Sequence, residues 1–399
     1  MSIEYHHQHI HTLEDLEDGV SVFLRLDLNV PLRGDEITDD TRIRAALPTI
    51  KRLIEKKCKI TIASHLGRPK GKVIAGESLL PVAQRLAELL DIEVVFPDDC
   101  IGTGVHKHLL DQQDDQIILL ENLRFHADEE QNNAEFARKL KSKHHAYVSD
   151  AFGALHREHA STAALPKLFD KKYAGLLVEK ELQALSRLIK TPSKPYSVVL
   201  GGAKISDKLK VVEALLKKAD RIFLGGAMVF TFLKARGHRV GNSLVEEDMI
   251  PRAKKIMDQA SDRGVSLFFP KDFYLGRSVE DPGEPQYCSS VSIPDGMMGL
   301  DIGPKTLAHF SEYLESSKTL FWNGPMGLFE KKPFHRGSFE LATLISKCNA
   351  YRVVGGGDSV AAINQSGLAD QVDHISTGGG ASLEYIEKGG LPGLRALAS

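Results

Sequence analysis

The stretch YRVVGGGDSVAAI runs from Tyr351 to Ile363 and joins β-prone residues to three glycines, an acid, a hydroxyl residue and small apolar residues. This order is typical of a strand that passes through a tight loop into a helix. Glycine lets the backbone approach a phosphate closely, and a helix that starts just afterwards adds the positive end of its dipole. The stretch therefore predicts a strand–loop–helix unit with a possible phosphate cradle in its loop.

The same pattern of a short apolar run, a polar or glycine-bearing loop and a helical stretch recurs in both halves of the chain. Strands that are nearly continuous in apolar residues and alternate with helices are typical of a parallel sheet covered on both faces. The fold class is therefore α/β, with two doubly wound, Rossmann-like units. The expected strands are 20–28, 59–63, 116–120, 145–148, 197–200, 221–224, 266–269, 319–322 and 351–354.

The length of 399 residues favours two domains, at about 150 residues for each. The helical stretch Glu179–Ile189 is followed by KTPSKP at Lys190–Pro195, where two prolines break the pattern. We expect domains at 1–185 and 186–380, facing each other across a cleft and joined by a hinge helix.

The composition is that of a soluble globular protein, with 42% apolar and 26% charged residues. The net charge of −2 argues against a nucleic-acid binder. Cys58, Cys100, Cys288 and Cys348 lie far apart and form no CxxC pair, which indicates free thiols. With no apolar leader and no stretch that could span a membrane, we expect a cytoplasmic protein.

Four loops of the later half are rich in glycine, and each follows an expected strand. Parallel strands place such loops at one edge of the sheet, where ligands bind. Lys204 and Lys208 have the spacing of one helix face and would add positive charge. Plain turns remain the alternative for at least one loop. The loops are LGGAKISDK (200–208), LGGAM (224–228), VGGGDS (354–359) and STGGGAS (376–382).

None of these loops matches the dinucleotide fingerprint GxGxxG or the P-loop GxxxxGK[ST]. Asp358 offers carboxylate oxygens, which suit a magnesium ion that also contacts nucleotide phosphates. The same aspartate could instead cap the following helix, a role that Ser359 could share. The residues alone leave both readings open.

The earlier half carries arginines and histidines after its expected strands instead of glycine runs. Guanidinium groups suit carboxylate and phosphate oxygens, so a set of them on one edge indicates a cage for a small polyanion. Histidines 6, 7, 9 and 11 suggest a metal site, but they lie in an unpatterned terminus, which we interpret as a solvated tail. The segments with the arginines are RLDLNVP (25–31), SHLGRP (64–69), ENLRFH (121–126) and DAFGALHREH (150–159), with Arg42 at the start of a helix.

Segments along nearly the whole chain resemble the phosphoglycerate kinase family. Leu28 and Ser359 depart from residues that are frequent in the family, but both changes are conservative. The matching segments are RLDLNVP, TDDTRIRAALPTI, SHLGRP, LLENLRFH, SDAFGALHR, LGGAKISDK, GLDIGPKT, FWNGPMGLFE, VVGGGDSVAA and STGGGASLEYIEKGGLPGL.

The resemblance implies that domain 1–185 binds 3-phosphoglycerate, that 186–380 binds ATP or ADP with Mg²⁺, and that 381–399 returns to the first domain. Asp358 would bind the magnesium and Glu330 the ribose. Arg42, Lys204 and Gly379 would act in catalysis. The substrate-binding residues would be Asp27, Asn29, Arg42, His65, Arg68, Arg124 and Arg157. The nucleotide-binding residues would be Lys204, Lys208, Asn323, Glu330, Gly355, Gly356, Gly357, Asp358 and Ser359, with the 378–380 glycines along the phosphates.

The implied activity is reversible phosphoryl transfer between 1,3-bisphosphoglycerate and ADP in glycolysis and gluconeogenesis, by a monomer that closes over both ligands. The acceptor carboxylate is ionised at pH 7, so no protein general base is required. Two rivals are a binding protein that closes over a phosphorylated metabolite without chemistry and a nicotinamide dehydrogenase. The missing GxGxxG fingerprint disfavours the dehydrogenase.

Overall fold

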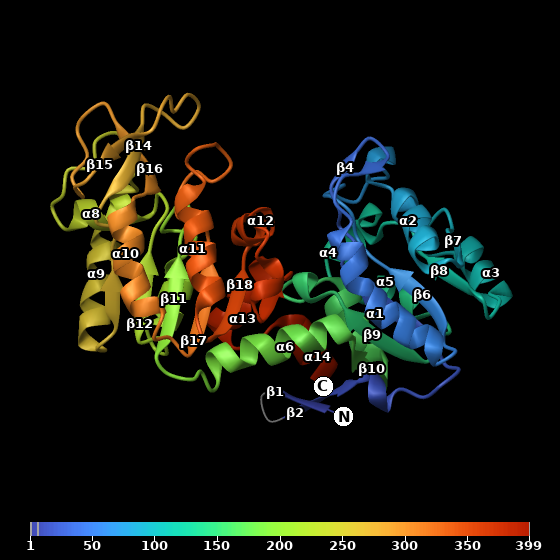
Figure 1. Ribbon diagram of the computed structural model, residues 1–399. Coiled ribbons are helices and arrows are strands. Elements are labelled where there is room, and N and C mark those ends of the chain that lie inside the picture. Colours follow the sequence, from blue (N-terminus) through green and yellow to red (C-terminus); the bar gives the residue numbers. More distant parts are fainter. Residues whose placement is uncertain (1, 6–7, 399) are drawn as a thin grey trace. The chain divides into compact units, whose positions relative to one another are not determined.

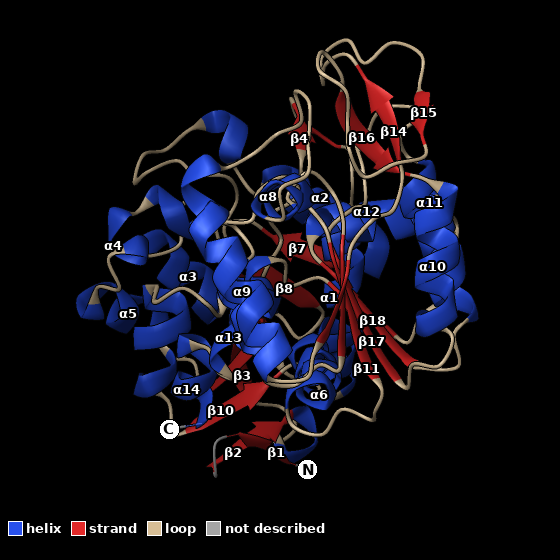
Figure 2. Cartoon of the chain, turned by 90° about the vertical axis from the view of Figure 1, so that its left-hand side faces the viewer, coloured by secondary structure: helices blue, strands red, loops and turns tan. Residues whose placement is uncertain are grey.

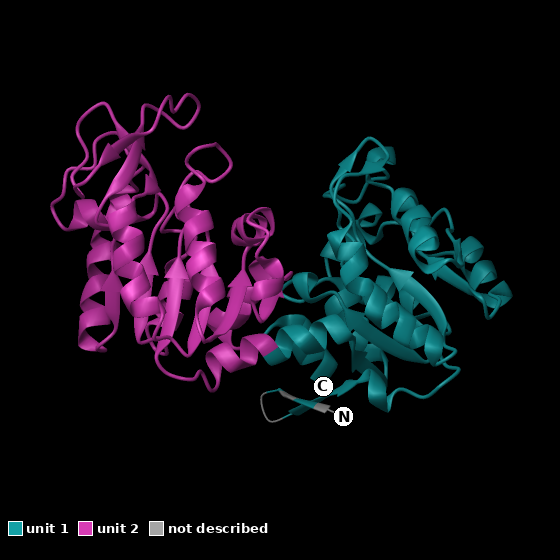
Figure 3. Cartoon of the chain, viewed as in Figure 1, with its two compact units in different colours: residues 1–183, 390–399 teal, residues 184–389 magenta. Residues whose placement is uncertain are grey.

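The computed structural model describes residues 2–5 and 8–398, so His6 and His7 of the histidine-rich terminus lie outside the described residues. The chain forms two compact units, residues 1–183 with 390–399 and residues 184–389 (Figure 3). The boundary falls within helix α6 (Leu176–Ile189). No described helix is long and apolar enough to cross a membrane.

The first unit is built on an eight-stranded sheet with the order β1-β2-β10-β9-β3-β6-β8-β7 (Figure 1). Its described pairings are parallel apart from that of β1 with β2. The strands are β1 (Ser2–Tyr5), β2 (Gln8–Thr12), β3 (Ser21–Leu26), β6 (Lys59–Ala63), β7 (Glu93–Val95), β8 (Gln116–Leu119), β9 (Ala146–Asp150) and β10 (Lys171–Ala174), beside a hairpin of β4 (Leu32–Arg33) and β5 (Glu36–Ile37). The helices are α1 (Thr41–Glu55), α2 (Leu80–Leu90), α3 (Thr103–Asp111), α4 (Ala127–Glu130), α5 (Ala134–Lys141) and α14 (Pro392–Ala398).

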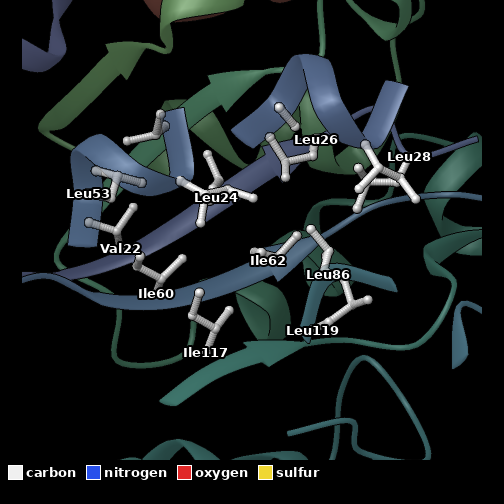
Figure 4. Packing of buried hydrophobic residues seen from close by; sticks show 14 of the residues in the cluster. Val22, Leu24, Leu26, Leu28, Leu53, Ile60, Ile62, Leu86, Ile117 and Leu119 are labelled. Atoms are coloured by element: carbon white, nitrogen blue, oxygen red, sulfur yellow. The ribbon is translucent and has the colours of Figure 1, made fainter. Parts of the chain in front are cut away.

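One face of strand β3 contributes to the hydrophobic core of the first unit. Val22 and Leu24 lie opposite Ile60 and Ile62 of β6, and Leu53 of α1 packs on the same cluster (Figure 4). Side chains alternate between the two faces of a strand, so Arg25, which directly follows Leu24, lies on the other face, where it is 1% exposed. A charged residue is thus buried between the apolar residues Leu24 and Leu26 of the strand.

The second unit contains a parallel six-stranded sheet with the order β13-β12-β11-β17-β18-β19 and a small antiparallel sheet, β15-β14-β16. Figure 2 shows α8, α9 and α13 on the opposite side of the strands from α10 and α11. The strands are β11 (Tyr196–Leu200), β12 (Arg221–Leu224), β13 (Ser266–Phe268), β14 (Phe273–Gly276), β15 (Gln286–Cys288), β16 (Met298–Ile302), β17 (Thr319–Asn323), β18 (Tyr351–Gly355) and β19 (His374–Ser376). The helices are α7 (Leu209–Leu215), α8 (Val229–Ala235), α9 (Ile250–Asp262), α10 (Pro304–Leu314), α11 (Arg336–Lys347), α12 (Gly357–Gln365) and α13 (Gly380–Lys388).

These elements confirm the α/β class and the two doubly wound units. Each strand expected from the sequence is present within a few residues of its expected bounds. The segment that rejoins the first unit begins at Gly390, later than the expected 381. Helix α13, which contains residues 381–388, contacts α7 of the second unit, and Gly393 donates a backbone hydrogen bond to Leu155 of the first.

Candidate functional site

The arginines and histidines predicted in the earlier half follow neighbouring strands of the first sheet. His65 follows β6, Arg124 lies in the short 3-10 turn Leu123–Phe125 after β8, and Arg157 follows β9. Strands β9, β3, β6 and β8 are consecutive in the sheet and run parallel. Their carboxyl ends, and with them these residues, therefore lie on one edge.

A hydrogen-bonded group forms in the loop after β3. The Arg42 guanidinium donates to Asp27 Oδ1 at 3.0 Å and to the carbonyl oxygen of Asn29 at 3.1 Å. The Asn29 side chain accepts from the backbone N–H of Gly67 at 2.9 Å. Arg42 keeps 41% of its side chain exposed, whereas Asp27 keeps 13%. The ion pair thus holds Arg42 at the site while leaving part of its guanidinium open to a ligand.

His65 lies deeper, with only 6% of its surface exposed. Arg25 Nη2 lies 3.1 Å from His65 Nδ1, so the guanidinium donates to that ring nitrogen. Burial, followed by the positive charges of Arg25, Arg124 and Arg42, lowers the pKa of His65 well below its ordinary value. A neutral ring that accepts at Nδ1 carries its proton on Nε2, which lies 4.0 Å from Asp27 Oδ1.

Positive groups gather around Arg124, which is itself 4% exposed. Burial and the charges of Arg25 and Arg157 lower the pKa of Arg124 to about 10, and its Nη1 donates to the carbonyl oxygen of Gly67 at 2.7 Å. Burial, followed by the charges of Arg124, Arg25 and Arg157, lowers the pKa of His159 to about 3. Cations crowded at low solvent exposure repel one another, so this edge of the sheet favours an anion.

Arg68 is the most open residue of the predicted substrate set. Its side chain is exposed, and its backbone N–H donates to Glu77 at 3.3 Å. The structure also brings Arg25, which the sequence reasoning did not select, into contact with His65 of this group. His159, likewise not selected, lies near enough for the charges of the arginines to act on it. The available signal for Arg25 was its position between the apolar residues of a predicted strand.

In the second unit, the chain leaves β11 toward β12 and β13 and later returns to β17 on the other side of β11. Such a reversal of strand order opens a crevice at the carboxyl ends of the two strands, where α/β proteins bind ligands. The loops that follow are Gly201–Lys208 after β11 and Gly324 onward after β17. The structure thus places the predicted Lys208 and Asn323 at a topological switch point.

Lys204 and Lys208 do not share a helix face, so that part of the sequence reasoning is wrong. Helix α7 begins at Leu209, and both lysines precede it in the loop. Lys204 is exposed, whereas Lys208 is half-buried and donates to the Asn323 side chain. Burial lowers the pKa of Lys208, and the charges of Asp358 and Asp207 act in the opposite direction.

A network of side-chain hydrogen bonds joins the loops after β17 and β18. Asn323 Nδ2 donates to the carbonyl oxygen of Gly355 at 2.6 Å. The Ser359 hydroxyl donates to the same carbonyl at 2.7 Å and accepts from the backbone N–H of Gly324 at 2.8 Å. The Asn323 and Ser359 side chains thus hold the backbone of the glycine loop in place. Ser359 serves this purpose and does not cap α12.

The glycines of the four loops serve two different purposes. A Cβ atom at Gly201 would lie 1.9 Å from the carbonyl oxygen of Pro325, and one at Gly226 would lie 2.5 Å from the backbone of Gly202. These glycines allow the loops to pack on one another. A Cβ atom at Gly357, Gly379 or Gly380 would meet nothing within 4 Å. Gly379 has a φ of +52°, which itself favours glycine. Neither packing nor a positive φ requires glycine at Gly357 and Gly380, so space remains there for a ligand.

Asp358 stands in the first turn of α12, and the N-cap residue is Gly356, which has no side chain. The Asp358 carboxylate accepts no hydrogen bond from any residue that the structure describes, so the capping interpretation is wrong. Asp358 and Glu330 both line a cavity of about 260 Å³ whose walls include Gly202, Phe230 and Met326. The cavity is largely apolar, and Asp358 in its wall directly follows the open Gly357. Such a cavity can accept a nucleotide.

The fold and these residues define a two-unit α/β protein with cations at the strand ends of one unit and glycine loops at the strand ends of the other. The family model "Phosphoglycerate kinase" matches residues 13–389. The chain is 50% identical over 391 residues to the phosphoglycerate kinase of Anaeromyxobacter dehalogenans, with 97% of this chain and 99% of that protein covered. The phosphoglycerate kinase of Trichodesmium erythraeum is 49% identical, with 95% and 96% covered.

A solved structure of phosphoglycerate kinase from Coxiella burnetii matches with a TM-score of 0.88 at 36% identity, covering 98% of this chain and 100% of that one. The chain belongs to the phosphoglycerate kinase family.

Proposed function

We propose that this chain catalyses the reversible transfer of a phosphoryl group between 1,3-bisphosphoglycerate and ADP, giving 3-phosphoglycerate and ATP in glycolysis and gluconeogenesis. One observation carries the proposal. The same chain holds a cluster of arginines and histidines at the strand ends of one unit and open glycine loops beside a cavity in the other. The first arrangement suits a small polyanion, and the second suits a nucleotide.

In the first unit, 3-phosphoglycerate would bind to the residues after β3, β6, β8 and β9. Arg68, Arg124 and Arg157 are fork-shaped donors for the phosphate oxygens. His65, held neutral with its proton on Nε2, would donate one further hydrogen bond, while Asp27 and Asn29 would orient the substrate hydroxyl and carboxylate. Arg42, half-exposed and fixed by Asp27, would extend toward the acyl end.

In the second unit, ATP or ADP would lie in the cavity lined by Glu330 and Asp358. Glu330 would accept from the ribose hydroxyls. Lys204, Lys208, Asn323 and the 355–359 loop would contact the phosphates, with the Gly379 backbone near the transferring group. The 357, 379 and 380 glycines leave the room that such close contact requires.

Asp358 fits a magnesium ligand, because its exposed carboxylate has no hydrogen-bond donor among the described residues and lines the same cavity. A bound Mg²⁺ would supply charge neutralisation on the nucleotide phosphates. Lys204 and Arg42 would stabilise the negative charge of the phosphoryl group during in-line transfer. The acceptor carboxylate is ionised at neutral pH and needs no base, so the protein's task is alignment and exclusion of water.

Because each unit would hold one ligand, direct transfer requires the two ligands to be brought together by closure about a hinge. We propose further that the protein acts as a monomer in the cytoplasm on small-molecule substrates.

The test is a coupled assay of phosphoryl transfer from ATP to 3-phosphoglycerate with magnesium, on the wild-type protein and on Arg42→Ala. Removing one contact that stabilises transition-state charge lowers turnover by about 100- to 1000-fold, and we expect 3-phosphoglycerate binding to persist. Arg44→Ala is the matched control, because Arg44 lies on the same helix and pairs with Asp40 on the surface. Binding without any turnover in the wild-type protein would favour the rival binding protein.

A further inference from the structure

A second cluster of side chains with metal-ligand chemistry lies in the first unit, outside the residues discussed above. It consists of Asp99 and Cys100, in the loop between β7 and α3, and of His126, which directly precedes α4. One ligand atom from each of the three residues lies within 4.8 Å of the other two. A carboxylate, a thiol and an imidazole thus converge from two separate segments of the chain.

The Asp99 carboxylate stands at the centre of this cluster. Its Oδ1 lies 2.6 Å from His126 Nε2 and accepts the backbone N–H of Cys100 at 2.6 Å. The His126 ring packs against buried Phe136 of α5, with ring centroids 5.3 Å apart. Hydrogen bonds and ring packing therefore hold two of the three groups in place before any ion binds.

Two of the three residues in the cluster are open to solvent, and the third is buried. Cys100 is 2% exposed, while the side chains of Asp99 and His126 are 49% and 26% exposed. An ion can therefore arrive from solvent over the carboxylate and the imidazole and reach a sulfur that is shielded from water. Burial, followed by the charge of Asp99, raises the pKa of the Cys100 thiol well above its ordinary value, so the metal-free cysteine keeps its proton.

The charges of the three groups match a divalent ion. An aspartate, a thiolate and a neutral histidine carry two negative charges, which one divalent cation neutralises. Sulfur, nitrogen and oxygen ligands together favour zinc, whereas magnesium prefers oxygen ligands and keeps several waters. The magnesium that the phosphoryl-transfer reaction requires should therefore not compete for this cluster.

We propose that Asp99, Cys100 and His126 bind a zinc-class transition-metal ion, with solvent in the fourth coordination position. Ligand atoms at about 2.0 Å from zinc lie roughly 3.3 Å apart in a tetrahedral site. The Asp99–His126 contact of 2.6 Å must open by under an ångström to admit the ion, and the Cys100 sulfur, which lies within 4.8 Å of the other two ligand atoms, must move toward it. Asp99 and His126 are partly exposed and have room for this shift. The Cys100 thiol gives its proton to solvent as the metal–sulfur bond forms.

Titration of the purified full-length protein with Co²⁺, a spectroscopic substitute for Zn²⁺, tests this proposal. A thiolate bound to cobalt gives a near-ultraviolet charge-transfer band that imidazole ligands do not give. The band therefore distinguishes this cluster from metal binding by the histidine-rich N-terminal segment. We expect saturation at one cobalt per chain, displacement of the band by Zn²⁺, and persistence of the band in excess Mg²⁺.

Three variants complete the test. Cys100→Ser should abolish the band, and His126→Asn should weaken cobalt affinity by at least about tenfold, since even outer-shell changes at metal sites cost 10- to 100-fold. Cys58→Ser is the matched control, because Cys58 is a buried free thiol in the same unit and should leave the band unchanged. Phosphoryl-transfer activity of each variant reports that it is folded.

Absence of the band in the wild-type protein, or its survival in Cys100→Ser, would overturn the proposal and leave the cluster as a hydrogen-bonded brace between two loops. If phosphoryl transfer is absent while the band behaves as expected, the proposed function fails and the metal site stands.

Discussion

Replacing Gly357 with alanine should stabilise the protein while it weakens nucleotide binding. Gly357 is the first residue of α12, it lacks a positive φ, and a Cβ atom there would meet nothing within 4 Å. Alanine at a position whose backbone it can adopt without strain raises the free energy of unfolding by about 0.4–1 kcal/mol, because it restricts the unfolded chain. The fold alone therefore gives no reason for glycine at this position.

The proposed function gives the reason, because the methyl group would occupy the space through which a phosphate approaches the backbone. A hydrogen bond to a charged group contributes about 1.5–3 kcal/mol, and losing one would weaken nucleotide affinity by roughly 10- to 100-fold. We expect the Kd for magnesium-ATP, measured by isothermal titration calorimetry, to rise by that factor. Denaturant unfolding should show a midpoint at or above that of the wild-type protein.

Gly104→Ala is the matched control. Gly104 also lies in the first turn of a helix, α3, with nothing within 4 Å of its Cβ position and without a positive φ. It should give the same stabilisation and leave the Kd unchanged. A Gly357→Ala protein that binds magnesium-ATP as tightly as the wild-type protein would refute the phosphate role of this loop.

Three further predictions address the metal ligand, the pH dependence and closure. Asp358→Asn should raise the magnesium concentration that half-maximal activity requires and lower the maximal rate, as a magnesium titration would detect; an unchanged titration would exclude Asp358 as a ligand. Burial lowers the pKa of His144 to about 4 from an unfolded value near 6.5. As the pH falls, the unfolded state therefore binds a proton before the folded state does, so the free energy of unfolding is highest above pH 6.5 and falls by about 3 kcal/mol as the pH drops to 4. His144→Gln should flatten the decline of unfolding free energy in that window, and an equally steep decline in the variant would contradict the assignment. Small-angle scattering should show a smaller radius of gyration with both 3-phosphoglycerate and nucleotide than with either alone, whereas an equal decrease with phosphoglycerate alone would contradict closure by two ligands.

The nine main strands and the fold class follow from the sequence alone. Apolar runs bounded by glycine and polar residues fixed strands such as 59–63 and 351–354, because a strand buried on both faces must be apolar along its length. Strands β1, β2, β4, β5, β7, β10 and β19 were not predicted; each is short and partly polar, and loops show the same pattern. The interpretation of the histidine-rich terminus as a solvated tail is wrong for Gln8–Thr12, which form β2 and pair with β1 and β10, although the side chains of His9 and His11 are exposed. The small antiparallel sheet of β14, β15 and β16 was also missed.

The tertiary structure decided which residues meet. Lys208 and Asn323 are 115 positions apart, and they contact each other because β11 pairs with β17. The order of the strands is a property of the whole sheet, so a local sequence pattern cannot predict it. The structure likewise showed that Lys204 and Lys208 precede α7, where their spacing of four had suggested one helix face.

The burial of Arg25 depends on contacts that form only when the chain has folded. Its position among apolar residues placed it on a strand, but the partners that make its burial tolerable, Ser161 at 2.7 Å and His65 at 3.1 Å, come from distant segments. A charge is stable inside a protein only where such groups surround it, and their arrangement exists only once the chain has folded. The sequence therefore determined which residues could bind anions, and the packing of the strands decided which of them form one site.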